Sequence, residues 1–281
     1  MVFGVENKAN IQKQISAAVE AARITNPLVG SVTNAVSISF VANAQLAVGG
    51  SAAIVYLYEE GEILAETGGS FYINVGTLLP IHEQSLSLMA KRLHELGKPW
   101  VLDPVAVGIG TLRSSLLTQF KEYKPSIIRG NASEIKALAS LWGLVEMKNS
   151  RVRGVDSTDA VSSAKAAAVA LAKWTSGAVA VSGETDLVTN GSVVAASYGG
   201  SPYFEKVTGA GCSLGGVTAV YAAVAPPFIA ALTATAMYNL AGCRAEEMAN
   251  GPGSFQVGFI DELHQATATD VANNPLEIEG A

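Results

Sequence analysis

The sequence has little charge, few cysteines and no long uninterrupted apolar run. Only 15% of its 281 residues are charged, with 18 basic against 24 acidic side chains and a formal net charge of −6. That balance, without any basic cluster, argues against a nucleic-acid surface. Two cysteines, Cys212 and Cys243, do not make a disulfide framework. Free thiols are typical of a reducing cytoplasm, where we expect the protein to act.

Other absences exclude further classes of protein. No apolar run is long enough to cross a bilayer, so we expect no transmembrane helix, and the N-terminus lacks a signal-peptide pattern. His82, His94 and His264 are scattered, at what we expect to be helix surfaces, and give no support to zinc or Ser/His/Asp chemistry. The chain has no early strand–GxGxxG–helix unit, which makes a nicotinamide-binding oxidoreductase the weakest alternative.

What the sequence does contain is an alternation of short apolar segments with longer helical ones. We expect strands at 27–34, 52–58, 71–76, 100–103, 125–129 and 178–182, and a hairpin at 186–198 turning at Asn190-Gly191. Helices are expected at 9–22, 40–47, 80–96, from 131, and at 157–175, 213–224, 227–249 and 257–268. This order predicts an α/β fold: a mostly parallel central sheet with helices on both faces and an antiparallel edge hairpin.

We find no linker, so we interpret residues 1–281 as one domain with a frayed tail at 273–281. Hydrophobic residues make up 49% of the chain, which predicts a large core and contacts between subunits.

Residues 207–216, Val-Thr-Gly-Ala-Gly-Cys-Ser-Leu-Gly-Gly, follow a short β-like run and open an Ala-rich helix. Backbone N–H groups at the two glycines, together with a helix N-terminus, suit an anion such as phosphate. Cys212 then lies in the first helical turn, where a thiolate is favoured and faces whatever the glycines bind. A lone G-x-G before a helix is weak evidence, because most such patterns are ordinary tight turns.

Polar residues also follow the other expected strands. In a parallel sheet, ligands bind beyond the carboxyl ends of the strands. The residues at those ends are Thr33-Asn34, Asp103-Pro104, Arg129–Glu134, Ser182–Asp186 and Gly209–Cys212. An arginine, several carboxylates, a glycine-rich turn and a thiol suit phosphoryl transfer, with cations for the phosphate and carboxylates for Mg²⁺.

The acidic candidates also have purely structural interpretations. Asp103 before Pro104 is equally consistent with a turn cap. Asn131 and Glu134 have the spacing of a capping box, which is compatible with Glu134 also holding a metal-bound water. Glu184 and Asp186 are consistent with solvated loop charges.

The cationic and thiol candidates have such alternatives too. Arg129 at a strand end suits a pair with a carboxylate across the sheet as well as a phosphate contact. Cys212 suits a small buried hydrophobic residue, which is the interpretation we adopt for Cys243 in the middle of a helix.

With these residues in view, the chain resembles the hydroxyethylthiazole kinase family of the ribokinase-like superfamily. The matching motifs run in order from about residue 27 to 265. The most specific are Arg-Gly-Asn-Ala-Ser-Glu at 129–134 and the cysteine that ends the glycine-rich turn. The others are at 32–34, 40–43, 74–78, 101–105, 181–184 and 251–255.

The resemblance implies a ribokinase-like fold and transfer of the γ-phosphate of ATP to the primary alcohol of 4-methyl-5-(2-hydroxyethyl)thiazole, a salvage step toward thiamine. It also implies Mg²⁺ and a homotrimer that holds the thiazole between subunits. The roles it implies are catalysis by Cys212, metal contacts by Asp103 and Glu134, ATP contacts by Arg129, Asn131, Ser182 and Gly211, and thiazole contacts by Asn34, Ile38 and Gly209.

The departures from the family pattern fall on what we expect to be the acceptor side. Gly30 and Ser31 replace a His and a Cys, Ile38 replaces a Met that lines the thiazole site, and Ser39 replaces an Asn. The loop at 56–60 is bulkier than in the family. Kinase chemistry is therefore better supported than the alcohol. The alternatives are a kinase of another heteroaromatic alcohol, such as a hydroxymethylpyrimidine, and a nucleotide-binding homologue without turnover.

Overall fold

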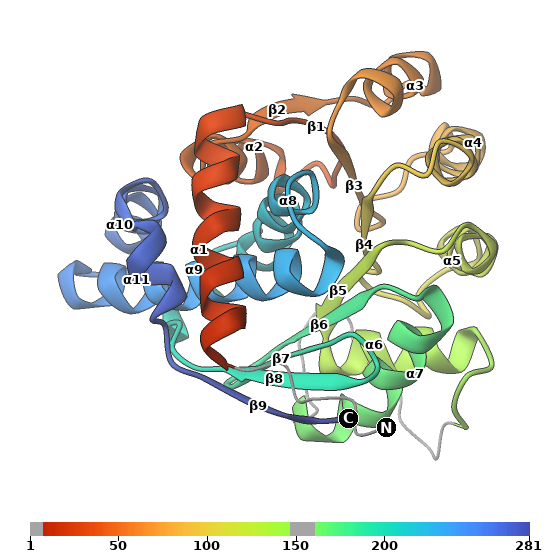
Figure 1. Cartoon of the computed structure of the whole chain (residues 1–281). Coiled ribbons are helices and arrows are strands. Elements are labelled where there is room, and N and C mark those ends of the chain that lie inside the picture. The colour runs from red at the N-terminus through yellow and green to blue at the C-terminus, as the bar shows by residue number, and fades with distance from the viewer. Residues whose placement is uncertain (1–7, 147–160) are drawn as a thin grey trace.

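One continuous β-sheet organises the residues that the computed structural model describes, 8–146 and 161–281 (Figure 1). Its strand order is β2-β1-β3-β4-β5-β6-β7-β8-β9. The strands are β1 (Leu28–Val32), β2 (Ser51–Ile54), β3 (Ser70–Asn74), β4 (Trp100–Asp103), β5 (Ile127–Asn131), β6 (Ala178–Ser182), β7 (Asp186–Thr189), β8 (Val193–Ser197) and β9 (Leu276–Gly280). Neighbours from β2 to β6 pair in parallel, and those from β6 to β9 pair antiparallel. The expected sheet with its antiparallel edge is confirmed.

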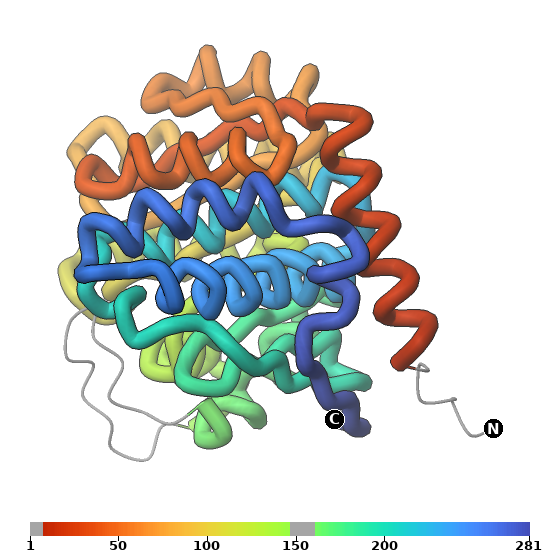
Figure 2. The backbone as a smooth tube through the Cα atoms, turned by 90° about the vertical axis from the view of Figure 1, so that its left-hand side faces the viewer, coloured from red at the N-terminus to blue at the C-terminus, as the bar shows by residue number. Residues whose placement is uncertain are grey.

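Helices cover both faces of the sheet (Figure 1). One face carries α3 (Tyr58–Thr67), α4 (His82–Glu95), α5 (Thr111–Tyr123), α6 (Ala132–Leu141) and α7 (Lys165–Thr175). The other carries α1 (Lys8–Thr25), α2 (Ile38–Ala47), α8 (Ala210–Ala222), α9 (Pro227–Met248), α10 (Pro252–Gln265) and α11 (Ala268–Ala272). Figure 2 shows α10 running beside α9 and α2, which it contacts. No described helix combines the length and apolarity that a membrane span requires.

Two apolar cores lie on the two faces of the sheet, because successive strand side chains point to opposite faces. In β3, Phe71 and Ile73 belong to the core under α3–α7, whereas Tyr72 belongs to the core under α8 and α9. This alternation brings Tyr72 to the same face as the glycine-rich turn.

The C-terminal tail was expected to fray, and that expectation is wrong. Residues 276–280 form β9, which pairs along the whole of β8, and Leu276 is buried. The preceding α11 packs on α1. The local composition of the tail cannot predict β9, because this strand forms by pairing with β8, about eighty residues earlier in the sequence.

Among the described helices, α3, α5 and the short α11 were not expected from the sequence. The segment expected as a strand to residue 58 ends at Ile54, and α3 begins at Tyr58. Gly61 lowers the helix propensity of α3, but the side chain of Met89 fills the space where a Cβ of Gly61 would lie. Before the glycine-rich turn, the expected β-like run is a 3₁₀ helix, Pro202–Lys206. The expected helix at 157–175 lies partly outside the described residues, which contain α7.

Candidate active site

Asp103 lies at the centre of the candidate site, at the carboxyl end of β4, and is fully buried. Its Oδ2 accepts hydrogen bonds from the Tyr72 hydroxyl at 2.9 Å and the Asn74 amide at 3.1 Å, and the Arg129 guanidinium lies 3.5 Å away. Its Oδ1 is buried and has no hydrogen-bond partner among the described residues. Burial raises the pKa of Asp103, and the charge of Arg129 only partly opposes that shift. These contacts replace the turn cap that was one interpretation of Asp103.

Arg129 connects three parts of the site. It lies in β5, and its guanidinium contacts Asp103 and donates to Ser182 Oγ at 3.0 Å. A Cβ added to Gly211 would lie 2.9 Å from Nη1, so the guanidinium lies directly against the glycine-rich turn. Burial alone would lower the pKa of Arg129, but the negative charges of Asp103 and Glu134 outweigh burial and raise it. Arg129 therefore pairs with Asp103 and also lies beside the glycine-rich turn, so both interpretations of its position are compatible.

The glycine-rich turn begins α8 as the sequence predicts. Gly209 is the N-cap residue with φ +87°, a backbone conformation that favours glycine. A Cβ there would also lie 2.9 Å from Ser37 Cβ, so the start of α2 packs closely on the turn. Ile38, the first residue of α2, is half-buried beside this contact. The first-turn N–H groups of α8 therefore lie between the Arg129 guanidinium and the start of α2.

Cys212 lies in the first turn of α8, and its Sγ accepts a hydrogen bond from the Asn34 amide at 3.1 Å. The same amide donates to Asn74 Oδ1 at 3.2 Å. Burial raises the pKa of the Cys212 thiol, and the negative charge of Asp103 adds to the shift. The helix-terminus argument for a favoured thiolate is therefore wrong, because burial and Asp103 outweigh Arg129. At neutral pH the group is a thiol.

Glu134 forms the capping box that its spacing predicts. Its Oε2 accepts from the Asn131 N–H at 2.9 Å, and its N–H donates to Asn131 Oδ1. Its Oε1 accepts from the Ala106 N–H at 3.2 Å. Burial, with a contribution from the charge of Asp103, raises the pKa of Glu134 to about 7. Asn131 is also the register partner of Ser182, so two of the four expected ATP-contacting residues are adjacent.

Whether these residues suit Mg²⁺ follows from their free oxygens. The described residues contain no group of three or more His, Cys, Asp or Glu side chains arranged for a metal. Mg²⁺ bound with a nucleotide needs only one or two carboxylates, with phosphates and water completing its shell. Asp103 Oδ1 is a buried carboxylate oxygen to which none of the described residues donates, and both Glu134 oxygens accept from backbone N–H groups. The site fits a nucleotide-bound Mg²⁺ at Asp103, with Glu134 reached through water.

Two departures from the family pattern do not lie on the acceptor side, contrary to expectation. Phe71 fills the space where a Cβ of Gly30 would lie, on the α3–α7 face of the sheet. Ser31 is fully buried and accepts a hydrogen bond from Gln45 Nε2 at 3.0 Å. At both positions a neighbouring core residue therefore compensates: Phe71 fills the space beside Gly30, and Gln45 satisfies the Ser31 hydroxyl.

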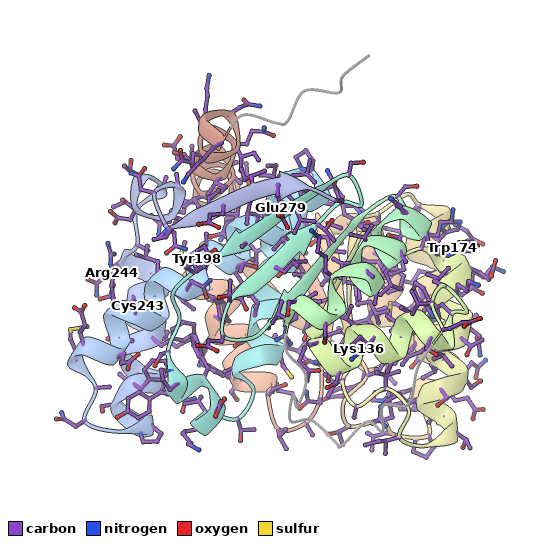
Figure 3. All side chains as sticks on the ribbon, turned by 90° about the horizontal axis from the view of Figure 1, so that it is seen from below. Lys136, Trp174, Tyr198, Cys243, Arg244 and Glu279 are labelled. Carbon is purple, nitrogen blue, oxygen red and sulfur yellow. The ribbon has the colours of Figure 1, made fainter. Side chains whose placement is uncertain are left out.

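Other expectations for individual residues are corrected by burial. His82 is 1% exposed rather than on a helix surface. Its ring stacks on Tyr56 with centroids 6.0 Å apart, and its Nδ1 accepts from the Leu79 N–H. Cys243 was expected to be buried, but it lies on the exposed side of α9 (Figure 3).

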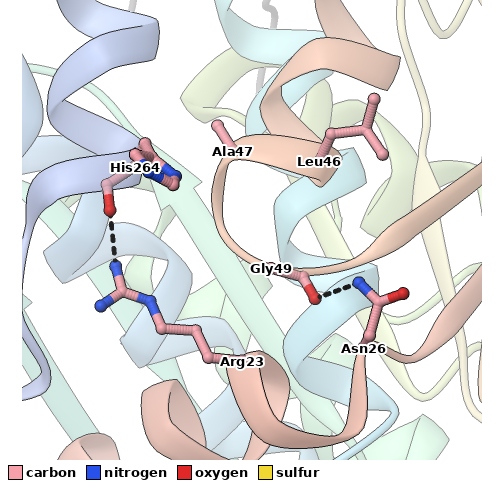
Figure 4. A pocket seen from close by; sticks show the side chains of 6 residues that line it. All are labelled: Arg23, Asn26, Leu46, Ala47, Gly49 and His264. Atoms are coloured by element: carbon pink, nitrogen blue, oxygen red, sulfur yellow. Dashed lines mark hydrogen bonds between the residues drawn. The ribbon is translucent and has the colours of Figure 1, made fainter.

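A hollow of about 400 Å³, lined by Arg23 and His264, lies at the end of α2 remote from the site (Figure 4).

Asp186 was interpreted as a solvated loop charge together with Glu184. Glu184 is exposed, but Asp186 is buried at the start of β7. Its Oδ1 accepts from the Gly183 N–H at 2.9 Å, which holds the loop that follows Ser182. Burial raises the pKa of Asp186 to about 6. No local pattern predicts this contact, because Asp in turns ordinarily accepts from an N–H group two residues further along the chain.

Comparison with solved structures first defines the class. A pyridoxal kinase from Staphylococcus aureus aligns with a TM-score of 0.60 at 13% identity, covering 91% of this chain and 99% of that one. A ribokinase-like superfamily protein from Enterococcus faecalis aligns with a TM-score of 0.61 at 14% identity, over 93% and 95% of the two chains. The fold is that of the ribokinase-like kinases. The glycine-rich turn, Arg129 and Asp103 lie together at the carboxyl edge of its sheet.

The sequence comparisons then define the family. The family model described as Hydroxyethylthiazole kinase family matches residues 19–269. Hydroxyethylthiazole kinase from Bifidobacterium adolescentis is 50% identical over 95% of this chain and 94% of that protein. Hydroxyethylthiazole kinase protein from Pyrococcus horikoshii is 30% identical, with a TM-score of 0.84 over 96% and 99% of the two chains. The chain belongs to the hydroxyethylthiazole kinase family.

Asp186 makes a prediction for stability. Its pKa is about 6 in the folded protein against an ordinary 3.8, so the folded state binds this proton more tightly than the unfolded state. The free energy of unfolding, measured relative to Asp186→Asn, should fall as pH rises from about 4 to 6, by up to about 3 kcal/mol. Denaturant titrations across this range measure it, with Glu184→Gln as the control in the same loop. A difference that is flat or rises with pH would contradict the burial argument.

Proposed function

We propose that this protein transfers the γ-phosphate of ATP to the primary alcohol of 4-methyl-5-(2-hydroxyethyl)thiazole. The observation that carries the proposal is the placement of the Arg129 guanidinium, which lies against Gly211 while contacting Asp103 and Ser182. One cation is thereby fixed between an anion-binding turn and a buried carboxylate. Members of the family that share this chain's length carry the name of this activity.

In this mechanism Arg129 and the first turn of α8 bind the phosphate. Phosphoryl transfer needs positioning and neutralisation of charge more than covalent chemistry. Arg129 is held by Asp103 and Ser182, so it offers its charge without reorganising. The first-turn N–H groups after Gly209 direct donors at the transferring group. A Mg²⁺ ion bound with ATP would be held by Asp103, with Glu134 through water, and would supply further charge neutralisation.

Cys212 is the residue we assign to the alcohol. Its thiol is raised in pKa by burial, so it is better suited to orient the hydroxyl than to act as a thiolate base. Asn34 fixes the direction of Sγ through its 3.1 Å hydrogen bond. Ile38 and Gly209, which lie at the facing ends of α2 and α8, form the side on which the thiazole ring would lie.

The direct test of the proposal is release of ADP by the purified protein with ATP and Mg²⁺, with and without the hydroxyethyl thiazole. We expect strong stimulation by the thiazole and weak stimulation by hydroxymethylpyrimidine. Binding of ATP without stimulation by the thiazole would refute this acceptor and leave the nucleotide half of the site intact.

Removing the Cys212 thiol tests its role in orienting the alcohol. We expect Cys212→Ala to lower kcat by roughly ten- to a hundredfold without abolishing turnover, because positioning is lost while Arg129 and the turn remain. Cys212→Ser keeps an acceptor for Asn34 and should retain more activity than the alanine variant. Steady-state kinetics measure both, with the exposed Cys243→Ser as control. Full turnover by Cys212→Ala would remove Cys212 from the mechanism.

We further propose a homotrimer with the thiazole held between subunits. Large apolar side chains surround the carboxyl edge of the sheet and are 44–70% exposed. They lie in or beside the loops after β1, β2, β3 and β4, and are Val36, Leu57, Leu79, Ile81 and Ile109. Five exposed apolar side chains on the loops that border the site support a subunit interface there.

The assembly prediction is a solution mass three times the 28.9 kDa of the chain. Val36→Glu combined with Ile81→Glu should dissociate the trimer and lower turnover, because charges would be buried in the interface. Ile24→Glu, at an 82% exposed position on the opposite edge of the sheet, is the matched control and should remain trimeric. Light scattering coupled to size-exclusion chromatography measures the mass, and a monomeric unaltered protein would refute the proposal.

A further inference from the structure

The two oxygens of Asp103 have very different surroundings. Oδ2 receives the Tyr72 hydroxyl and the Asn74 amide and lies beside Arg129, whereas Oδ1 is buried with no partner among the described residues. A carboxylate with one saturated oxygen and one bare oxygen is held in a single orientation. The groups that saturate Oδ2 therefore decide where Oδ1 points.

Tyr72 is one of those groups, and the sequence analysis assigned it no role. It is fully buried in β3, on the face that packs against α8. Its hydroxyl lies 2.9 Å from Asp103 Oδ2 and 2.8 Å from the carbonyl oxygen of Cys212, and it accepts from the Asn74 amide at 2.9 Å. One O–H group is thus placed between the carboxylate and the backbone of the glycine-rich turn.

Helix α8 leaves space for the Tyr72 ring at Gly215. A Cβ added to Gly215 would lie 2.5 Å from Tyr72 Cε2 and 2.7 Å from its hydroxyl oxygen. Any larger residue at 215 would displace the phenol from Asp103. A glycine inside a helix costs about 1 kcal/mol relative to alanine, so its place in α8 has a packing reason in Tyr72.

The hydrogen bonds close into a ring that joins both halves of the site. The single hydroxyl proton of Tyr72 is shared between Asp103 Oδ2 and the Cys212 carbonyl oxygen, and the Asn34 amide donates to both Cys212 Sγ and Asn74 Oδ1. Asn74 returns the ring to Asp103. In this ring, Tyr72 is the member that ties the carboxylate to the first turn of α8.

We propose that Tyr72 is a positioning residue that saturates Asp103 Oδ2, so that Oδ1 is presented to the Mg²⁺ carried by the nucleotide. The inference rests on the proposed function, because it assumes that a nucleotide with Mg²⁺ binds at Asp103. Tyr72 itself is fully buried, and its hydroxyl forms hydrogen bonds only with Asp103, Asn74 and the Cys212 carbonyl oxygen among the described residues, so it acts through Asp103.

The test is Tyr72→Phe, which keeps the ring against Gly215 and removes only the hydroxyl. Calorimetric titration with ADP should show binding weakened about tenfold when Mg²⁺ is present, and unchanged binding in EDTA, since hydrogen bonds to charged groups have about this strength. In steady-state assays, kcat should fall about tenfold while KM for the thiazole stays unchanged.

Tyr221→Phe is the matched control, because Tyr221 is also fully buried and its hydroxyl has no partner among the described residues. It should bind ADP like the unaltered protein in both conditions. Mg²⁺-dependent ADP binding that survives intact in Tyr72→Phe would overturn the inference alone. Equal loss with and without Mg²⁺ would also overturn it, because Tyr72 would then support the pocket generally. If the unaltered protein showed no Mg²⁺-dependent binding, the proposed nucleotide site and the inference would both fail.

Discussion

The buried pair of Asp103 and Arg129 is the interaction on which the rest of the site depends. Two charges removed from water are stable only when further hydrogen bonds satisfy them. Here those bonds come from Tyr72 and Asn74 on β3 and from Ser182 on β6. The need to satisfy one ion pair therefore fixes the positions of side chains from β3, β4, β5 and β6 at one edge.

The same pair explains why burial dominates the electrostatics of the site. Asp103, Glu134 and Cys212 all have pKa values raised by burial, and the charge of Asp103 adds to the shifts of the other two. Arg129 offsets only part of this negative charge. An additional cation would stabilise the charged forms of these acids, which supports the proposal that Mg²⁺ binds here together with ATP. It also makes Cys212 a neutral group that orients its neighbour.

Much of the fold was predictable because its signals are local. The capping box of Asn131 and Glu134, the hairpin at Asn190-Gly191 and the helix after Gly209 depend on neighbouring residues, and the structure contains all three. The rule that ligands bind beyond the carboxyl ends of parallel strands predicted the grouping of Asp103, Arg129 and Gly211, and the structure brings these residues together. What failed were statements on burial, for His82, Asp186 and Cys243 among others, because burial depends on elements distant in the sequence.

The sequence by itself determined the class of fold and the kind of chemistry, because strand and helix periodicity, turn residues and motifs depend on residues close together in the chain. Only the tertiary structure decided how residues compensate one another. It showed that Phe71 fills the space above Gly30, that Gln45 satisfies Ser31, and that Gly215 admits the ring of Tyr72. These partners meet across the sheet and its helices, and their contacts depend on the packing of segments far apart in the chain.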